Sequence, residues 1–530
     1  MRFAISIEEI SGGVDCPEPL DSTRGLKRRR NGLSNGPTLP PLSAGTYSMK
    51  TSIAPFVFVC LLPLCAVAAP TATHPFCRVD VDGRELPLHE FRQGAFGVFE
   101  LARPAEITVH TAFDARWVDI RPKSAALTAV VEPDHHTIRF RLASVVPLTV
   151  EFNRDLEHVL HLFAYAPEVG APVSGTPGVR WFGPGEHDAG LIDLHDGETL
   201  YLAPGAWVRG HVRSIGTHDV AVRGRGVLDG SVGGLAGDPA VVGPGTDGEH
   251  NMIYLERTER ARIEGITIFN SPGAWTVYLN RSNGARIDGV RILNPSVHYG
   301  DDGFDLVSSS DVLLENSFVR TNDDCVVVKN LADVDTHDIT VRHAVLWNMP
   351  TGGNGLEIGF ETRQQPIHRV RFEDIDIIHV ERGSAISIHN GDADTVEDVV
   401  FDNIRVEDAR RKLIDFAVVY AQYGADRPAT DAENARRLDT GGLWDGLLGY
   451  PPAEQKARAG FRGRIRNVLV KDLHVVDGAL PYSIFAGFDA DHPVADVVVE
   501  GLQHLGRPIR SPEEGKFVIE NAPGFVLRPQ

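Results

Sequence analysis

The feature that most constrains the fold is a short motif that recurs along the chain. Each copy has an aliphatic or aromatic residue, one polar residue, then Gly, Asn, Asp or a similar residue, followed by alternating β-formers. Copies begin at Ile263, Ile287, Leu314, Val341, Phe372, Phe401, Val470 and Val499. The first six are about 24 to 31 residues apart, which favours a right-handed parallel β-helix whose coils bury their inner faces by stacking. Leucine-rich repeats have similar periods, but their dense leucine pattern and helical segments are absent.

This pattern predicts a β-helix catalytic domain over residues 181–525. Between Phe401 and Val470 the interval more than doubles, so we expect an insertion at about residues 411–466. A long insertion in a repeat protein often lies on one face and binds there. The alternative is a packing loop that covers the coil and buries the aromatic residues of the insertion, which include Tyr420, Tyr423, Trp444 and Tyr450.

Residues 77–175 alternate polar and apolar positions over short runs such as Glu106–His110 and Thr137–Arg141. Turn residues recur every ten or so positions, and no helical period competes. This is typical of a small antiparallel β-sandwich. The predicted fold class is therefore all-β, a right-handed parallel β-helix preceded by a small β-sandwich, with a Pro/Gly-rich linker at Pro167–Gly178 between the two.

The first residues do not resemble the start of a folded domain. Residues 1–48 are expected to be a mis-called or disordered extension. Residues 49–69 are typical of a signal peptide, with a lysine after Met49, an apolar run and then Ala66-Val67-Ala68. We therefore expect a secreted or periplasmic protein without a stable membrane anchor. A cytoplasmic tail with an anchor is disfavoured because the apolar run is short and interrupted by proline.

Charge and cysteine content exclude several classes of protein. The formal net charge of -20 argues against nucleic acid as a partner, since phosphate binding needs clustered Lys and Arg. It also argues mildly against a strongly anionic polymer. Only Cys77 and Cys325 follow the leader, so a disulfide scaffold is excluded. No Cys/His cluster has metal-ligand spacing, and no phosphate-binding loop follows a strand. We therefore predict no cofactor and no metal; the alternative is a calcium ion at a carboxylate cluster.

Three carboxylates lie in the stretch Gly300–Lys329, at Asp302, Asp323 and Asp324. About 21 residues separate Asp302 from Asp323, roughly one coil of a β-helix, which is expected to stack them side by side. Glycoside hydrolysis needs such a set, with one acid to protonate the leaving oxygen and one carboxylate to activate water. Paired carboxylates also move each other's pKa apart. The alternative for Asp323 and Asp324 is a turn or N–H-capping pair.

At these residues the chain resembles glycoside hydrolase family 28, the polygalacturonases and rhamnogalacturonan hydrolases, over about residues 181 to 510. The matching landmarks are Gly224–Gly230 (GRGVLDG), Asn270–Trp275 (NSPGAW), Gly300–Asp305 (GDDGFD), Thr321–Cys325 with Lys329, and Gly353–Gly359 (GNGLEIG). The resemblance implies an inverting mechanism with Asp323 as general acid, and with Asp302 and Asp324 holding and deprotonating the attacking water. The preceding sandwich resembles the layout of the related dextranases and isopullulanases of family 49.

Two positions depart from the family pattern. Asn354 stands where the family has the histidine of G-H-G, and Ser387-Ile388-His389 stands where it has R-I-K, which holds the galacturonate carboxylate. Losing both cations removes the charge partner of a uronate, so the sugar bound there is expected to be neutral or held in another way. Glu357 lies at an outward position of the same strand pattern and is expected to replace part of the lost polar set.

The predicted sugar-binding residues each have a structural alternative. Lys329 contacts substrate or is a solvated strand residue, and Asn354 is a ligand or bonds a neighbouring coil. The other candidates are Glu357, His389 and His298. Glu357 and His389 could instead be ordinary outward-facing polar residues of a strand, and His298 could lie in a segment that packs near the core.

We therefore predict an exported inverting glycoside hydrolase that cleaves O-glycosidic bonds of a polysaccharide or oligosaccharide that is not a typical galacturonan. The alternatives are a true polygalacturonase or rhamnogalacturonan hydrolase, a dextranase-like glucanase, or a non-catalytic carbohydrate-binding β-helix. A polysaccharide lyase would need a uronic acid and a basic residue as the base, and the acidic cluster argues against it.

Overall fold

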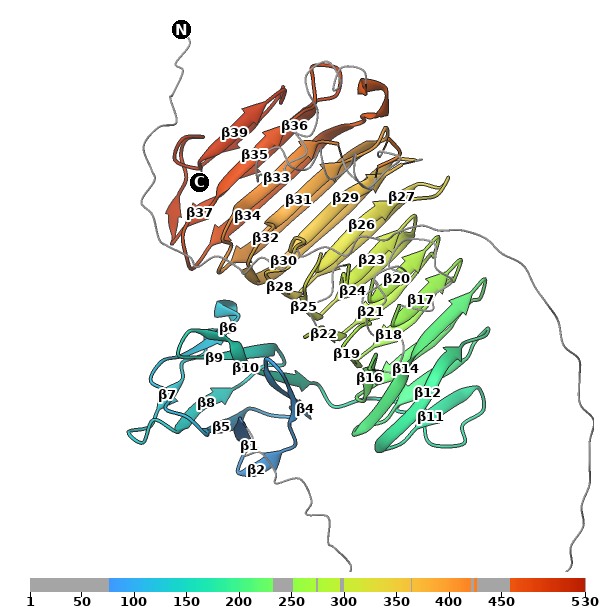
Figure 1. Ribbon diagram of the computed structural model, residues 1–530, viewed down its shortest axis with the longest axis vertical. Helices are drawn as coiled ribbons and strands as arrows, with labels where there is room; N and C mark the ends of the chain where they lie inside the picture. Colours follow the sequence, from blue (N-terminus) through green and yellow to red (C-terminus); the bar gives the residue numbers. More distant parts are fainter. Residues whose placement is uncertain are drawn as a thin grey trace, which may run out of the picture. The chain divides into compact units, whose positions relative to one another are not determined.

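The computed structural model describes residues 76–231, 251–272, 275–295, 300–363, 365–420, 424–426 and 458–529 (Figure 1). The expected extension at 1–48 and signal peptide at 49–69 lie outside the described residues. Within the described part, no helix is long and apolar enough to cross a membrane. The described elements are β-strands with short 3₁₀ turns at Lys123–Ala125 (η1) and Ala459–Phe461 (η3). Sandwich and coil belong to one compact unit, Ala72–Gln530.

The sandwich is made of two five-stranded sheets. One has the order β2 (Arg84–Leu86), β1 (Cys77–Val81), β5 (Ala105–Thr111), β8 (Thr137–Leu142), β7 (Val130–Val131). The other has the order β3 (His89–Phe91), β4 (Gly94–Glu100), β10 (Asp155–Tyr165), β9 (Pro147–Phe152), β6 (Val118–Arg121). Alternation places one face of each strand inside, where Val79, Ile107, Phe140 and Leu148 form the core with their neighbours.

One pairing in the sandwich differs from the expected antiparallel pattern. Strands β4 and β10 run parallel, with Gly94 opposite Val159 and Glu100 opposite Tyr165. The chain leaves β4, builds β5 to β9, and returns along the same direction, which a parallel pair requires. The strand order of this sheet depends on the crossover, which cannot be predicted from the alternation of polar and apolar residues along single strands.

The coil is one continuous sheet of 30 strands, β11 to β40, whose parallel pairings form three ladders. The first ladder contains β17 (Ile253–Glu256), β20 (Val277–Asn280), β23 (Phe304–Val307), β26 (Val326–Asn330), β29 (Leu356–Thr362), β31 (Ser384–Asn390), β33 (Lys412–Val418), β35 (Tyr482–Ala486) and β39 (Phe517–Glu520). The fold class predicted from the sequence, an all-β chain with a parallel β-helix after a small β-sandwich, is confirmed.

The second and third ladders complete each coil. The second contains β11 (Val179–Phe182), β13 (Thr199–Leu202), β15 (Ala221–Gly224), β18 (Arg262–Glu264), β21 (Arg286–Asp288), β24 (Ser310–Glu315), β27 (Thr336–Arg342), β36 (Val494–Glu500) and β40 (Val526–Arg528). The third contains β16 (Val227–Asp229), β19 (Thr267–Phe269), β22 (Arg291–Leu293), β25 (Phe318–Thr321), β28 (Val345–Asn348) and β37 (Gln503–His504), which also pairs with β38 (Arg507–Pro508).

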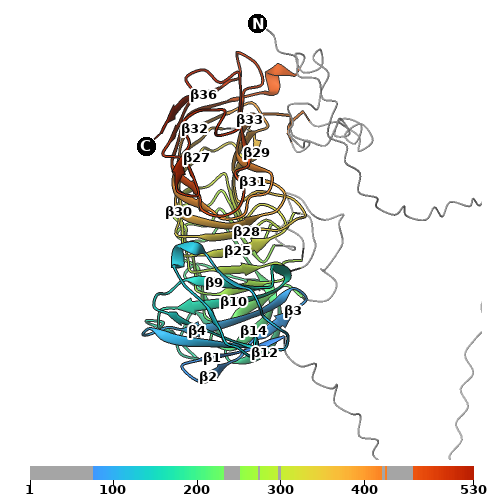
Figure 2. The same ribbon diagram turned by 90° about the vertical axis from the view of Figure 1, so that its left-hand side faces the viewer.

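Long strands run across two ladders at both ends of the coil. The strands β12 (Gly185–Asp193) and β14 (Ala206–Ile215) span the third and first ladders. The strands β30 (Ile367–Val380), β32 (Thr395–Val406) and β34 (Arg464–Val475) span the second and third. Figure 2 shows the first ladder, at β29, β31 and β33, on a different side of the coil from β27, β30 and β32.

The recurring motif forms the corner between the second and third ladders. Its third residue has a positive φ in every copy, from 51° at Asp472 to 73° at Gly265. Gly, Asn and Asp adopt this left-handed conformation at the lowest cost. The residues concerned are Gly265, Gly289, Asn316, His343, Asp374, Asn403, Asp472 and Gly501. The sequence repeat is thus a repeat of backbone conformation.

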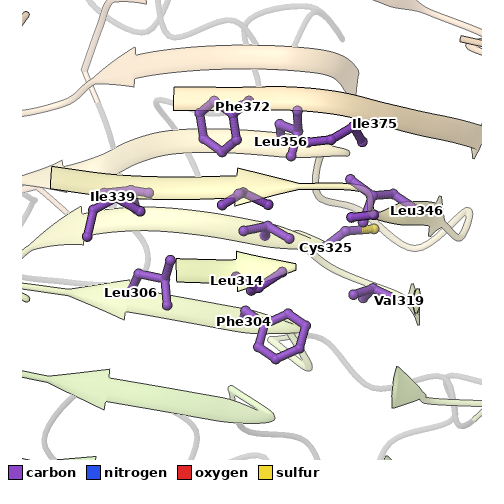
Figure 3. Close-up of a cluster of buried hydrophobic side chains, with 14 of the residues drawn as sticks. Phe304, Leu306, Leu314, Val319, Cys325, Ile339, Leu346, Leu356, Phe372 and Ile375 are labelled. Carbon is purple, nitrogen blue, oxygen red and sulfur yellow. The ribbon is translucent and has the colours of Figure 1, made fainter. Parts of the chain in front are cut away.

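The interior of the coil is filled by stacked apolar side chains. Figure 3 shows Phe304, Leu306, Leu314 and Leu346 among the inward-facing residues of adjacent coils. Further along, phenylalanine rings pack from coil to coil, with centroid distances of 5.0 to 5.7 Å, the first two pairs stacked and the last two edge-to-face. The rings in this column are those of Phe372, Phe401, Phe416, Phe485 and Phe517. Each coil buries its neighbour's inner face, so stability comes from stacking.

The expected insertion at residues 411–466 overlaps a strand of the coil. Residues Lys412–Val418 form β33, which pairs with β31 on one side and β35 on the other. Ile414 and Phe416 point inward and are fully buried, so this run is coil and the longer connection follows it. Residues 421–423 and 427–457, with Tyr423, Trp444 and Tyr450, lie outside the described residues.

Candidate active site

The candidate active site lies where the chain passes from the third ladder to the first. The connection from β22 to β23 carries Asp301 and Asp302, and the connection from β25 to β26 carries Asp323 and Asp324. The backbone N–H of Gly303 donates to the carbonyl of Asp324 at 2.8 Å. Asp302 and Asp324 therefore occupy corresponding positions on adjacent coils, and Asp323 corresponds to Asp301. The expected stacking of Asp302 with Asp323 is thus offset by one residue.

Asp323 is the most accessible of the three aspartates. It is half-buried, whereas Asp302 and Asp324 have only 3% and 6% of their surface exposed. The Asp323 carboxylate accepts hydrogen bonds from the backbone N–H of Gly300 at 3.0 Å and of Asp324 at 3.1 Å. Burial, reinforced by the nearby charge of Asp302, raises the pKa of Asp323 to about 7. This carboxyl can hold a proton near neutral pH and is reachable from outside.

Lys329 lies beneath the aspartates as a buried cation. Its ammonium donates to Asp302 Oδ2 at 3.0 Å and to Asp305 Oδ1 at 2.9 Å. It also lies 3.7 Å from the centroid of the Trp275 ring, a favourable cation–π position. Although burial disfavours the ammonium, Asp302 and Asp305 raise the pKa of Lys329 well above its usual value. The negative charge of Asp302 therefore has a fixed counter-charge.

Asp324 is held by Asn354 of the next coil. Its Oδ1 accepts the backbone N–H of Asn354 at 2.7 Å and the side-chain Nδ2 at 2.9 Å. Burial comes first in raising the pKa of Asp324 well above its usual value, followed by the charges of Asp302, Asp323 and Glu357. Together the three aspartates favour keeping at least one proton, because like charges this close cannot all ionise freely.

Two glycines let the backbone pass close to the aspartates. A Cβ at Gly353, whose φ is +69°, would lie 2.2 Å from the carbonyl carbon of Asp323. A Cβ at Gly303 would lie 2.3 Å from the carbonyl oxygen of Cys325. These glycines belong to the motifs around the aspartates, and close backbone approach explains why no larger residue fits there.

Most of the predicted site residues come together. Glu357 on β29 and His389 on β31 point outward from the first ladder, with His389 Nδ1 at 3.0 Å from both Glu357 carboxylate oxygens. Asn354 connects this pair to Asp324, because its Nδ2 also lies 3.1 Å from Glu357 Oε2. His298 lies outside the described residues.

Several charged residues of the site carried little signal in the sequence. Asp305 accepts a hydrogen bond from Lys329, and Asp415 contacts both His389 and Lys412. On the preceding coil, Asp301 accepts a hydrogen bond from the side chain of Asn322. Asp305 and Asp415 alternate with inward apolar residues, Phe304 and Leu306 or Ile414 and Phe416. A polar residue at such an outward position, on the strand ladder that follows Asp302 and Asp324, is the sequence signal that could have identified them.

Comparison with known proteins agrees with this geometry. Residues 206–434, which contain all of the charged residues described above, match the model of Glycosyl hydrolases family 28. A probable endopolygalacturonase D of Neosartorya fischeri is 31% identical over 199 residues, covering 36% of this chain and 38% of that protein. An endo-polygalacturonase of Pectobacterium carotovorum subsp. carotovorum is 23% identical over 178 residues, covering 33% and 42%. The chain thus spans well under half the length of the relatives it matches.

Solved structures with similar folds include Dex49A from Penicillium minioluteum, with a TM-score of 0.46 and 14% identity over 72% of this chain and 77% of that one. Another is a hyperthermoactive exopolygalacturonase from Thermotoga maritima, with a TM-score of 0.39 and 16% identity over 65% and 84%. The assignment rests on the family match and the sequence relatives. By these, residues 206–434 of this chain are similar to the family 28 glycosyl hydrolases, and polygalacturonases are among its sequence relatives.

Proposed function

We propose that this protein is an exported glycoside hydrolase that cleaves a polysaccharide or oligosaccharide with inversion. The observation that carries the proposal is the convergence of Asp323, Asp302 and Asp324 at one edge of the coil, with the proton-holding carboxyl the most accessible of the three. An inverting hydrolase needs one protonated and one ionised carboxyl group on opposite sides of a water molecule. Export is proposed from the leader-like residues that begin at Met49.

In this proposal the three aspartates have different tasks. Asp323 donates its proton to the leaving glycosidic oxygen, which its pKa of about 7 favours. Asp302 takes the proton of the attacking water, and the ammonium of Lys329 keeps this carboxylate in place. Asp324 orients the same water with the oxygen that Asn354 does not occupy. Lys329, Asn354, Glu357 and His389 form the floor of the sugar site.

The substrate is proposed to be a neutral sugar. Three cations of this polar network, Lys329, His389 and Lys412, already donate to carboxylates of the protein. A uronate carboxylate would therefore meet a surface whose remaining charge is negative, without a free cation among these three to pair with. A galacturonan hydrolase is the second candidate, because the sequence relatives are named as endopolygalacturonases.

The test is a reducing-sugar screen of the wild-type protein and of Asp323→Asn on dextran, pullulan, arabinan and galacturonan. Release from a neutral polysaccharide by the wild type alone is the expected result. Release from galacturonan alone would support the proposed hydrolase activity but contradict the proposal that the substrate is a neutral sugar. Undiminished release by Asp323→Asn would overturn the assignment of the acid. Sugar binding without release in either protein would instead indicate a non-catalytic carbohydrate-binding coil.

A further inference from the structure

A chain of buried polar groups continues from Asp324 along the first ladder for three more coils. It runs through Asn354, Glu357 and His389 to Asp415 on β33. Glu357, His389 and Asp415 are at most 4% exposed. Because they are buried, their polar atoms interact mainly with one another.

The orientation of the Asn354 amide is fixed at both ends. Its Oδ1 accepts the backbone N–H of Ser384 at 2.9 Å. Its Nδ2 therefore faces the carboxylates and divides its two hydrogens between Asp324 Oδ1 at 2.9 Å and Glu357 Oε2 at 3.1 Å. A single amide thus couples the position of Asp324 to that of Glu357.

His389 is held as a cation between two carboxylates. Nδ1 lies 3.0 Å from Glu357 and Nε2 lies 3.0 Å from Asp415 Oδ2, so both ring nitrogens donate. The ring also stacks on Phe360 at a centroid distance of 4.4 Å and an angle of 3°. Burial alone would disfavour this cation, but Glu357 and Asp415 raise the pKa of His389 to about 10. Lys412 donates to Asp415 at the far end of the chain.

We propose that Glu357, His389 and Asp415, with Lys412, form a positioning chain that orients Asp324 through Asn354. The proposal rests on the proposed function in giving Asp324 a catalytic task, but the chain itself is defined by contacts alone. These residues fix the carboxylate that holds the attacking water, and the balance of their charges sets the pH at which that carboxylate ionises.

The charges that face Asp324 come from Asp302, Asp323, Glu357 and Lys329. Replacing Glu357 by Gln removes a negative charge and keeps the shape, so the pKa of Asp324 should fall. Replacing His389 by Gln leaves Glu357 without its cation, so the pKa of Asp324 should rise. The two variants are therefore expected to move the acidic limb of the pH–rate profile in opposite directions, each by about half a pH unit or more. A purely structural role would lower the rate without this opposite movement.

The experiment measures kcat/KM from pH 4 to pH 8 for the wild type, Glu357→Gln and His389→Gln on the polysaccharide that the protein hydrolyses. Glu315→Gln is the matched control, since it breaks an ion pair between Glu315 of β24 and Arg342 of β27, on the second ladder, and should leave the profile unchanged. Thermal melting checks that each variant is folded. If His389→Gln does not fold, Lys412→Met replaces it, with a shift in the same direction expected.

A second measurement does not depend on activity. Carbon-13 NMR of protein labelled in its aspartate carboxyls follows the titration of Asp324, whose signal is identified by its loss in Asp324→Asn. Opposite shifts of this titration in Glu357→Gln and His389→Gln support the chain. Shifts in one direction, or none, overturn it whether or not the protein hydrolyses a sugar. Absence of hydrolysis by the wild type would overturn the proposed function alone.

Discussion

At the scale of single residues, the proposed hydrolysis depends on the proton of Asp323. An acid catalyst must be protonated, so activity is expected to fall as pH rises through the pKa of Asp323, about 7. Initial rates from pH 4 to pH 9 on a hydrolysed polysaccharide test this expectation. Activity that still rises at pH 9 would show that another group supplies the proton.

The raised pKa of Asp323 also has a cost in stability. A carboxyl whose pKa is higher in the folded protein stabilises the fold below its ordinary pKa, near 3.8, and loses that contribution as pH rises to about 7. Asp323→Asn should therefore stabilise the protein by about 1–3 kcal/mol at pH 8, because one pKa unit corresponds to about 1.4 kcal/mol and water reaches this half-buried group. At pH 4 the gain should vanish. Denaturant unfolding of both proteins at the two pH values measures it, and a gain that is larger at pH 4 would contradict the sign.

The sequence predicted that the three aspartates lie close together, but not their register. Their spacing indicated adjacent coils, yet the pairing of Asp302 with Asp324 depends on one residue of register, which the connection between β25 and β26 decides. Asp415 could be predicted to point outward from its alternation with Ile414 and Phe416. Its contact with His389 could not, since it depends on which strand follows β31 in the ladder.

At the scale of elements, the corner between the second and third ladders is the repeating unit. His343 is the copy in which neither Gly, Asn nor Asp occupies the left-handed position, with a φ of 54°. Other residue types pay about 1–2 kcal/mol in this conformation. His343→Gly is therefore expected to raise stability by up to about 1 kcal/mol, and His343→Val to lower it by at least as much. Thermal unfolding of both variants tests this.

A histidine inside a strand provides the control. His474 lies within β34, and its φ is not positive. There glycine gains nothing from its freedom and weakens the strand, so His474→Gly should lower stability by about 0.5–1 kcal/mol. If glycine has the same effect at positions 343 and 474, the left-handed backbone conformation does not explain the residue types at the third position of the recurring motif.

At the scale of the whole described molecule, the sandwich packs on the third ladder. Phe96, Val159 and Phe163 of the sandwich contact Phe318 and Trp347 of the coil. Arg320 of β25 is buried among them, 4.2 Å from the Trp347 ring centroid and 3.1 Å from His161 Nε2. The sequence indicated both domains but not this contact, because it is made in part by buried arginines, which a sequence pattern assigns to the surface.

A buried charge cluster at this contact gives a prediction. Arg121 of β6 donates to Glu151 of the sandwich at 2.8 Å and to Glu407 of the coil at 2.6 Å. Removing one partner of a buried ion pair leaves its carboxylates uncompensated, so Arg121→Leu should cost about 3–5 kcal/mol of stability. Arg116→Leu is the control, because Arg116 pairs with Asp114 at the surface and its loss should cost under about 1 kcal/mol. Equal losses in both variants would mean that Arg121 does not join sandwich and coil.

The proposed inverting hydrolysis is tested by following, with proton NMR, the first reducing ends released by the wild type and by Asp323→Asn. The wild type is expected to release sugar of the anomeric configuration opposite to that of the cleaved bond, because in the proposed mechanism water attacks from the far side of the ring. Asp323→Asn is expected to release at least about a hundred times less, since its amide cannot donate the proton. A retained configuration would contradict inversion, and an undiminished rate in the variant would contradict Asp323 as the acid.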